Sequence, residues 1–338
     1  LIYEQVASIL QDSDTALREQ FAHVLPGLET MYELFHIMLK ARDKRGAIDF
    51  EMTETQFLFD ENRKIASIEP RKRNDAHRLI EEFMIAANVA AAKYLLSSKL
   101  PVLYRVHEVP SIEKLSALRE FLGELGLFLG GGDEPEPGHY ASLLKTVSKR
   151  PDGHLLQTVM LRSMKQAVYS PDNVGHFGLG LEAYAHFTSP IRRYPDLLVH
   201  RAIKHAISRQ KKAAWRYSEE AMVQLGEHCS MASRRADEAT RDVADWLKCE
   251  YMRDRVGEVH EGVISGVTGF GLFVELSDIY IEGLVHVTAL KNDYYQFDAN
   301  GHRLMGERTR KSYRLGDSIR VKVVRVDLDE KKIDLDLA

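Results

Sequence analysis

The spacing of hydrophobic residues changes near residue 257, and this change constrains the fold more than any other feature. Before it, hydrophobic residues recur with the spacing of amphipathic helices, for example over 1–45 and 218–252. After it, apolar and polar residues alternate in short runs separated by glycines, as in β-strands. We therefore expect two domains of different class, one over residues 1–254 and one over residues 255–338.

The first domain is expected to be helix-rich with a few short strands. Its expected elements are two strands around a turn at Asp60–Asn62, a helix over 76–96 capped by Asn74 or Asp75, a strand over 101–110, and helices from Ser111, over about 138–148 and over about 152–168. The glycines and prolines of 176–196 predict a strand with tight turns, followed by a helix that Asp196 caps. The second domain holds about five short strands, which favours a small closed barrel. The expected fold class is α+β, with an all-β barrel at the end.

Composition narrows the class of protein. With 44% hydrophobic and 28% charged residues, the chain is typical of globular proteins. No apolar run reaches the ~18 residues of a membrane-spanning helix, so no membrane partner is expected. Cys229 and Cys249 fit neither a zinc spacing nor a disulfide framework. We expect them to be reduced thiols packed in a helix, and the compartment to be the cytoplasm.

Charge is distributed unevenly. The net charge is −4, yet residues 186–216 carry eight basic residues against one acid, Asp196. The eight are Arg192, Arg193, Arg201, Lys204, Arg209, Lys211, Lys212 and Arg216. A local basic surface of this kind is sufficient for nucleic-acid binding. Residues 257–338 hold eleven basic and fourteen acidic residues, so binding by that domain requires a local face.

The β domain carries four glycine-punctuated segments in a characteristic order. They are GEVHEGVI (257–264), GFGLFV (269–274), EGLVHV (282–287) and GDSIRVKVVRVD (316–327). Over this whole length the domain resembles the S1 branch of the OB fold, which implies RNA binding. Exposed aromatic rings on such a barrel stack bases at about 1–3 kcal/mol each. Phe270 and Phe273 are the candidate platform, and packing in the core is the alternative for both.

Four further residues complete the candidate RNA-binding face of the barrel. His286 can add stacking or a phosphate contact. Arg320, Lys322 and Arg325 can follow the RNA backbone, but the alternation in RVKVVRV does not decide which of them faces the RNA.

A long central motif carries the strongest signal. It is HFGLGLEAYAHFTSPIRRYPDLLVHR, from His176 to Arg201, and it resembles the signature of the ribonuclease II/R family of 3′→5′ exoribonucleases. Asn74–Ala92 and Arg234–Met252 resemble the same family. The resemblance implies a hydrolytic, processive enzyme. Its substrate would be single-stranded and structured RNA with a 3′ end, and its products nucleoside 5′-monophosphates.

Arginines in this motif are the candidate phosphate contacts. Pro190 and Pro195 fix the turns on either side of Arg192 and Arg193, and a guanidinium binds phosphate in a bidentate way. The resemblance assigns Arg192 the role of holding the phosphate at the cleavage site and stabilising the transition state. For Arg193, RNA binding and a solvated surface position remain open.

Three more residues take their roles from the resemblance alone. Phe50 matches a phenylalanine that stacks on the 3′-terminal bases, and packing in the core is its alternative. Glu81 matches a glutamate that contacts the ribose 2′-hydroxyl, a group that a carboxylate can bind. Tyr3 matches a tyrosine implicated in the same preference for RNA over DNA. Some relatives place a late catalytic-site glutamate where this chain has Thr240, two residues after Glu238, so that role stays unassigned.

The family cleaves with two Mg²⁺ ions, held by an aspartate-rich loop of the form DxxxxxDxDD. No segment of this chain reproduces that loop. We therefore expect the chain to be a C-terminal fragment whose partner is the upstream half of the catalytic domain. Such a fragment would hold no Mg²⁺ itself and would bind RNA without cleaving it. The alternative function is a non-catalytic RNA-binding module with an S1 domain.

Overall fold

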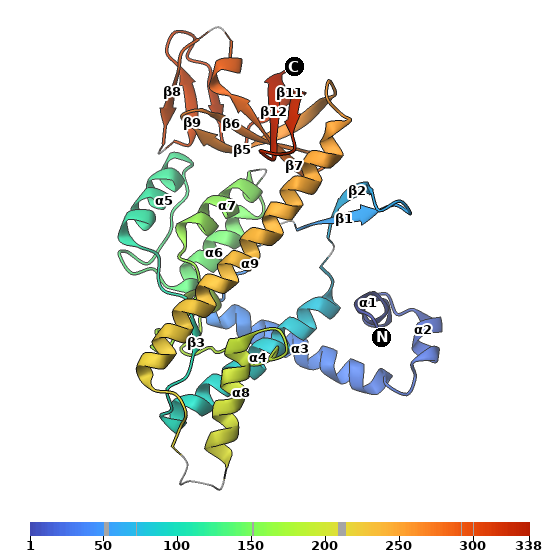
Figure 1. The fold of residues 1–338 in the computed structure, drawn as a ribbon, viewed down its shortest axis with the longest axis vertical. Coiled ribbons are helices and arrows are strands. Elements are labelled where there is room, and N and C mark those ends of the chain that lie inside the picture. Colours follow the sequence, from blue (N-terminus) through green and yellow to red (C-terminus); the bar gives the residue numbers. More distant parts are fainter. Residues whose placement is uncertain (51–53, 72, 151, 209–213, 292, 300) are drawn as a thin grey trace.

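A computed structural model describes residues 1–338 except 51–53, 72, 151, 209–213, 292 and 300. Helices make up most of the N-terminal part, and the C-terminal part is a barrel with a small additional sheet (Figure 1). The long helix α9 (Glu219–Arg253) runs obliquely along the helical part and ends at the barrel. The predicted α+β class, with a barrel at the end, is confirmed.

The first hundred residues form helices around one hairpin. Their elements are α1 (Tyr3–Leu10), α2 (Thr15–Gln20), α3 (Leu25–Arg45), β1 (Thr55–Phe59), β2 (Ile65–Pro70) and α4 (Asp75–Ser98). The predicted turn is present, since Asp60 Oδ1 accepts the N–H groups of Asn62 and Lys64. Asn74 is the cap of α4, because its Oδ1 accepts the N–H of His77 at 3.1 Å.

The middle of the chain pairs two short strands and adds three helices. These are β3 (Tyr104–Val106), α5 (Ile112–Glu124), α6 (Pro137–Val147), α7 (Gly153–Ser163) and β4 (Val168–Ser170). The predicted helix over about 152–168 is present but too long at its end, because α7 ends at Ser163. Residues 168–170 instead pair antiparallel with β3, a partner far away in the sequence.

The fully described segment 176–193 corrects a second prediction. It contains no strand, and its ordered parts are the short 3₁₀ helix η1 (Phe177–Leu179) and single bridges of His176 to His107 and to Leu181. Gly180 ends η1 with φ +61°, a conformation that glycine adopts without strain. Helix α8 (Tyr194–Ile207) follows.

The barrel closes in the order β11-β12-β7-β6-β5. Its strands are β5 (Val259–Thr268), β6 (Gly271–Leu276), β7 (Ile281–His286), β11 (Ser318–Asp327) and β12 (Lys332–Leu337). The 3₁₀ helix η2 (Val287–Ala289) and a three-stranded sheet lie between β7 and β11. That sheet consists of β8 (Tyr295–Asp298), β9 (Arg303–Gly306) and β10 (Ser312–Arg314). The predicted small closed barrel is confirmed.

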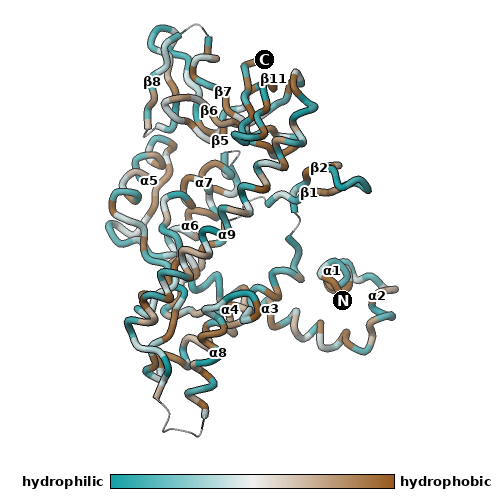
Figure 2. The backbone as a smooth tube through the Cα atoms, viewed as in Figure 1, coloured by the Kyte–Doolittle hydropathy of each residue, from teal (hydrophilic) through white to brown (hydrophobic). Residues whose placement is uncertain are grey.

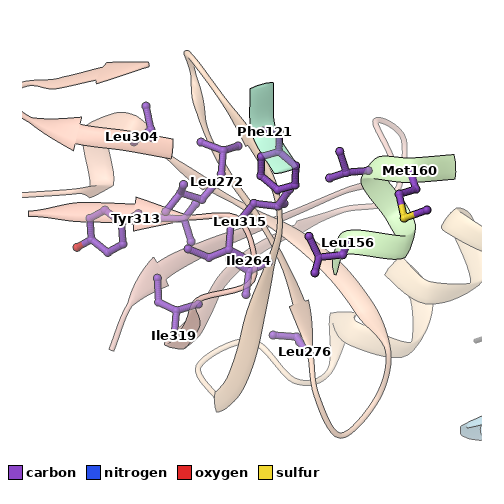
Figure 3. Close-up of a cluster of buried hydrophobic side chains, with 14 of the residues drawn as sticks. Phe121, Leu156, Met160, Ile264, Leu272, Leu276, Leu304, Tyr313, Leu315 and Ile319 are labelled. Carbon is purple, nitrogen blue, oxygen red and sulfur yellow. The ribbon is translucent and has the colours of Figure 1, made fainter. Parts of the chain in front are cut away.

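One hydrophobic core continues from the barrel into the helical part. Ile264 and Leu272 of the barrel belong to the same buried cluster as Phe121 of α5 and Met160 of α7 (Figure 3). Hydrophobic stretches also follow α8 and the barrel strands (Figure 2). Because the two parts share buried apolar surface, the barrel is packed firmly onto the helices. Cys229 and Cys249 lie buried on α9 as free thiols. Within the described ranges, no helix has both the length and the apolar character needed to cross a membrane.

Candidate functional site

The segment before α8 is held in place by one buried amide. Asn88 of α4 is 2% exposed, and its Oδ1 accepts the N–H groups of Phe187 and Thr188 at 2.9 and 3.2 Å. Its Nδ2 donates to the hydroxyl of Tyr184 at 2.9 Å. Sequence reasoning missed Asn88, although a lone amide in the apolar run AANVAAA is a usable signal. These bonds fix the approach to the SPIRR turn.

Asp196 fixes the other side of that turn. Its carboxylate is fully buried, and Oδ2 accepts the N–H of Ser189 and a guanidinium N–H of Arg193, both at 2.8 Å. The prediction that Asp196 caps α8 is wrong, because Arg193 occupies the cap position and Asp196 lies three residues further along the helix. Asp196 instead joins the start of the turn to its end.

The two neighbouring arginines are in different environments. Arg193 is engaged by Asp196, and its side chain is 21% exposed. Arg192 is exposed, and its guanidinium makes no hydrogen bond or ion pair with any residue of the described ranges. The backbone of Arg192 is fixed, since its N–H donates to Ser189 O at 3.3 Å. The fold thus presents one free guanidinium on a turn that is held from both sides.

The histidines of the motif make internal contacts. His186 bonds through Nδ1 to the hydroxyl of Tyr169 at 2.9 Å. Burial, and then the nearby charges of Arg193 and Arg105, lower the pKa of His186 to about 3, so this ring is neutral at pH 7. His200 donates from Nε2 to Phe187 O at 2.9 Å and stacks on the Phe187 ring. Both histidines stabilise the segment from within.

A basic cleft lies beside β3 and borders the same segment. It has a volume of about 890 Å³, and Arg105, Lys114, Arg162, Lys165 and Arg234 are among its lining residues. The guanidinium of Arg105 lies over the Tyr169 ring, 4.6 Å from its centroid. The backbone N–H of Arg105 donates to Tyr184 O at 2.9 Å, which ties the cleft wall to the motif. Sequence reasoning missed this cleft because its wall is assembled from β3, α5, α7, β4 and α9.

Glu81 and the ring of Tyr3 lie on the same face of α4. The ring of Tyr3 is 44% exposed and stacks on His77 at 4.3 Å, and Glu81 lies one helical turn after His77. Arg73 binds the Glu81 carboxylate through both Nε and Nη2. Glu82, the residue after Glu81, is buried and paired with Arg42. The sequence LIEEF does not show that one glutamate is exposed and the other buried.

Phe50 directly follows Asp49, which forms an ion pair with Arg73. The side chain of Phe50 is half-buried and packs against the main hydrophobic core. This agrees with the alternative interpretation of Phe50 as a core residue. Asp49 lies 3.6 Å from both Arg42 and Arg73, so an ion-pair network joins Asp49, the residue before Phe50, to the Glu81 carboxylate. Among the described residues, no hydrogen bond or ion pair joins Arg192 to this network.

The two aromatic residues of the barrel face outward. Phe270 is 49% exposed and Phe273 is half-buried, whereas Leu272 and Val274 point into the barrel. The rings of Phe270 and Phe273 lie edge to face with centroids 5.9 Å apart. The core alternative therefore does not hold for Phe270, and Phe273 lies on the outer side of β6.

The polar candidates of the barrel are all exposed, but they lie on two different strands, β7 and β11. His286 ends β7, and its Nδ1 bonds to Thr288 Oγ1 at 2.8 Å. Arg320 and Lys322 pair with β5, where Arg320 lies 3.7 Å from Glu261. A bulge between Val323 and Arg325 shifts the alternation of β11, so Arg325 also faces outward.

The remaining candidates are the basic segment before α9 and the acidic positions on α9. Arg209, Lys211 and Lys212 lie outside the described residues. Glu238 and Thr240 are exposed on α9, and Thr240 Oγ1 donates to Ala236 O. Across the part of the chain that the structure describes, no group of three or more His, Cys, Asp or Glu side chains is arranged to hold a metal ion.

Comparisons with known proteins agree with these features. The RNB domain model matches residues 1–209, and the S1 RNA binding domain model matches residues 253–337. Ribonuclease R of Escherichia coli K12 is 55% identical over 345 residues, which span 100% of this chain and 42% of the relative. Two structures of Mycoplasma genitalium RNase R each cover 99% of this chain at 27% identity. The apo form has a TM-score of 0.90, and the complex with ribose methylated single-stranded RNA has 0.91.

These matches cover only part of the relatives. The chain spans 42% of the E. coli protein and 53% of each M. genitalium chain. Both family models nevertheless match in the expected order, and the first covers more than half of this chain. The chain therefore belongs to the RNB domain family, carries an S1 RNA-binding domain, and is similar to ribonuclease R along its whole length.

Proposed function

We propose that this chain is the RNA-handling part of a processive, hydrolytic 3′→5′ exoribonuclease. The substrate would be single-stranded and structured RNA, and the products nucleoside 5′-monophosphates. The observation that carries the proposal is the free guanidinium of Arg192 on a turn fixed by Asn88 and Asp196. A rigid turn holds a charged group where a phosphate can meet it without further ordering.

Each candidate residue has a role in this proposal. Arg192 binds the phosphate at the cleavage site and stabilises the charge of the transition state. Phe50 stacks on the 3′-terminal bases. Glu81 accepts a hydrogen bond from a ribose 2′-hydroxyl, with Tyr3 beside it on the same face of α4. Arg73 holds the Glu81 carboxylate in place through Nε and Nη2.

The S1 domain supplies a second RNA contact. Phe270 and Phe273 offer outward-facing rings to bases, and His286 ends the neighbouring strand. Arg320, Lys322 and Arg325 are exposed and are candidates for backbone phosphates. Arg193 is the weaker candidate in the helical part, because its guanidinium is already engaged by Asp196.

The Mg²⁺ ions of the family require a cluster of carboxylates, and the described residues of this chain do not provide one. We therefore derive no metal-dependent step from this structure. The proposal places the aspartate-rich loop in the upstream half of the catalytic domain, which is the partner of this chain. On its own the chain binds RNA and does not cleave it.

A non-catalytic RNA-binding module is the second candidate function. The absence of a DxxxxxDxDD loop from this sequence favours it. A reducing cytoplasm is the proposed compartment in both cases, in keeping with two buried free thiols. We also propose that the functional division lies between residues 254 and 255, just after α9 ends at Arg253.

A binding assay tests the proposal at the ribose. The purified chain is titrated into 5′-labelled RNA and into DNA of the same sequence, and binding is measured by mobility shift. We expect RNA to bind more tightly than DNA, and Glu81→Gln to reduce that preference. Glu61→Gln, at an exposed position in the β1–β2 turn, is the matched control. Equal binding of RNA and DNA by the wild-type chain would contradict the role of Glu81.

A further inference from the structure

A cleft of about 510 Å³ separates α9 from the barrel. One wall belongs to the helix and the other to strands of the S1 domain. The lining residues from α9 are Asp245, Lys248 and Cys249, and the main ones from the barrel are Phe270, Phe273, Glu282, Leu284, Lys331 and Lys332. Neither domain forms this cleft alone, and α9 belongs to the part of the chain that precedes the barrel.

The barrel wall of the cleft is apolar and aromatic. Phe273 of β6 lies opposite Leu284 of β7 in the strand register, which makes a continuous apolar surface. Phe270 meets Phe273 edge to face, and its ring is 49% exposed. An exposed edge-to-face pair beside an aliphatic residue presents flat surface to a planar ligand such as a nucleobase.

The helix wall contributes an unpaired cation. Lys248 is half-buried, and its ammonium forms no hydrogen bond or ion pair with any residue in the described ranges. Lys331 is different, because it pairs with Asp242 of α9 and ties the β11–β12 turn to the helix. Lys332 bonds to Glu330 at 3.2 Å. Among the described residues, the ammonium of Lys248 is therefore available to an anion that enters the cleft.

The carboxylates of the cleft leave room for such an anion. Glu282 is engaged by the hydroxyl of Ser265 at 2.5 Å. Asp245 and Glu282 are the two acids that line the cleft, against the three lysines 248, 331 and 332. Asp242 and Glu330, which do not line the cleft, pair with Lys331 and Lys332, so Lys248 is the lining lysine that no acid of the described residues engages.

We propose that this cleft binds one nucleotide of single-stranded RNA, with its base on Phe270 and Phe273 and its phosphate on Lys248. The proposal deepens the proposed RNA-binding function and rests on it. It makes α9 part of the RNA site of the S1 domain. Arg320 and Lys322, which pair with β5, do not line this cleft.

Salt-dependent binding of the full 338-residue chain tests this. Labelled single-stranded RNA is titrated with wild type, Lys248→Gln and Lys248→Arg between ~50 and ~200 mM salt. We expect Lys248→Gln to weaken binding about fivefold and to reduce the slope of log affinity against log salt by about one. Lys248→Arg keeps the charge and retains the slope. Lys93→Gln, at an exposed position on α4, is the matched control and leaves both quantities unchanged.

Photocrosslinking locates the base independently of any variant. RNA carrying 5-bromouridine is irradiated with the wild-type chain, and crosslinked peptides are mapped by mass spectrometry. We expect crosslinks at Phe270 or Phe273. If wild type binds RNA but Lys248→Gln matches it in affinity and salt slope, the cleft proposal is wrong and the proposed function stands. Crosslinks that fall elsewhere would overturn both the cleft proposal and the role of the two rings in the proposed function. If wild type does not bind RNA at all, both proposals fail.

Discussion

The turn that carries Arg192 and the barrel surface that carries Phe270 are built in opposite ways. The turn depends on buried polar partners, Asn88 and Asp196, and a single guanidinium is left free at its surface. The barrel surface depends on two outward rings placed on a closed barrel with a hydrophobic core. The first arrangement suits a group that must meet one phosphate in a fixed place. The second suits bases of any sequence.

Because of this difference, substitutions in the two regions should affect different properties, the stability of the fold in one case and RNA binding in the other. Changes below the turn should unfold or distort the protein, whereas changes to the barrel rings should affect RNA binding and leave folding intact.

Removing the buried carboxylate should have the largest effect on stability. Asp196→Ala leaves the guanidinium of Arg193 half-buried and unpaired, and breaking such a pair costs about 3–5 kcal/mol. Urea unfolding measures the loss. Asp12→Asn, at an exposed position, should change the free energy of unfolding by less than about 0.5 kcal/mol. A loss for Asp196→Ala as small as that of the control would show that the turn does not depend on this network.

Removing the free guanidinium should separate activity from stability. Arg192→Ala should change the free energy of unfolding by less than about 0.5 kcal/mol, since its side chain has no described partner. In a longer protein that includes the upstream half, the same change should lower the rate of RNA hydrolysis by about 10²–10³. Single-turnover digestion measures this rate. An unchanged rate would remove Arg192 from the catalytic role.

Removing one barrel ring should weaken binding alone. Phe270→Ala should cost about 1–3 kcal/mol of RNA affinity and leave the melting temperature nearly unchanged, because the ring is half exposed. Mobility shift and thermal unfolding of the same preparation measure the two effects. A fall in melting temperature without a loss of affinity would reverse the contrast between the two regions.

Protonation of the motif histidines should have the smallest effect near neutral pH. Burial lowers the pKa of His186 and of His176 to about 3, whereas each would titrate near 6.5 in the unfolded chain. The unfolded state therefore binds more protons below pH 6.5, so stability is complete above that pH and falls as pH drops toward 3. Between pH 7 and 6 each histidine should cost less than about 1 kcal/mol. Denaturant titrations at several pH values measure the loss, and His186→Gln should make it smaller.

The sequence predicted the larger elements because their signals are local. Helical spacing located α4 and α9, with Asn74 as one of two candidate caps of α4, and glycine-separated alternation located the barrel. The errors arose where distant residues decide the structure. Strand β4 exists because β3 lies beside it, so the helix predicted through residue 168 ends earlier.

The candidate site shows the same limit. The motif singled out Arg192, but only the fold distinguishes its free guanidinium from that of Arg193. Asn88 and Arg73 act through contacts with segments that lie far away or around a turn, and no spacing in the sequence reveals them. The bulge in β11, which turns Arg325 outward, is equally hidden in the letters RVKVVRV.

Digestion of 5′-labelled single-stranded RNA by the purified chain with Mg²⁺ tests the central claim most directly. The chain and the chain joined to the upstream half are compared on a sequencing gel, with binding followed in parallel. The account predicts that the chain alone binds RNA without shortening it, and that the joined protein shortens it progressively from the 3′ end. Progressive shortening by the chain alone, persisting after repurification, would show that the required carboxylates are within these 338 residues and would contradict the account.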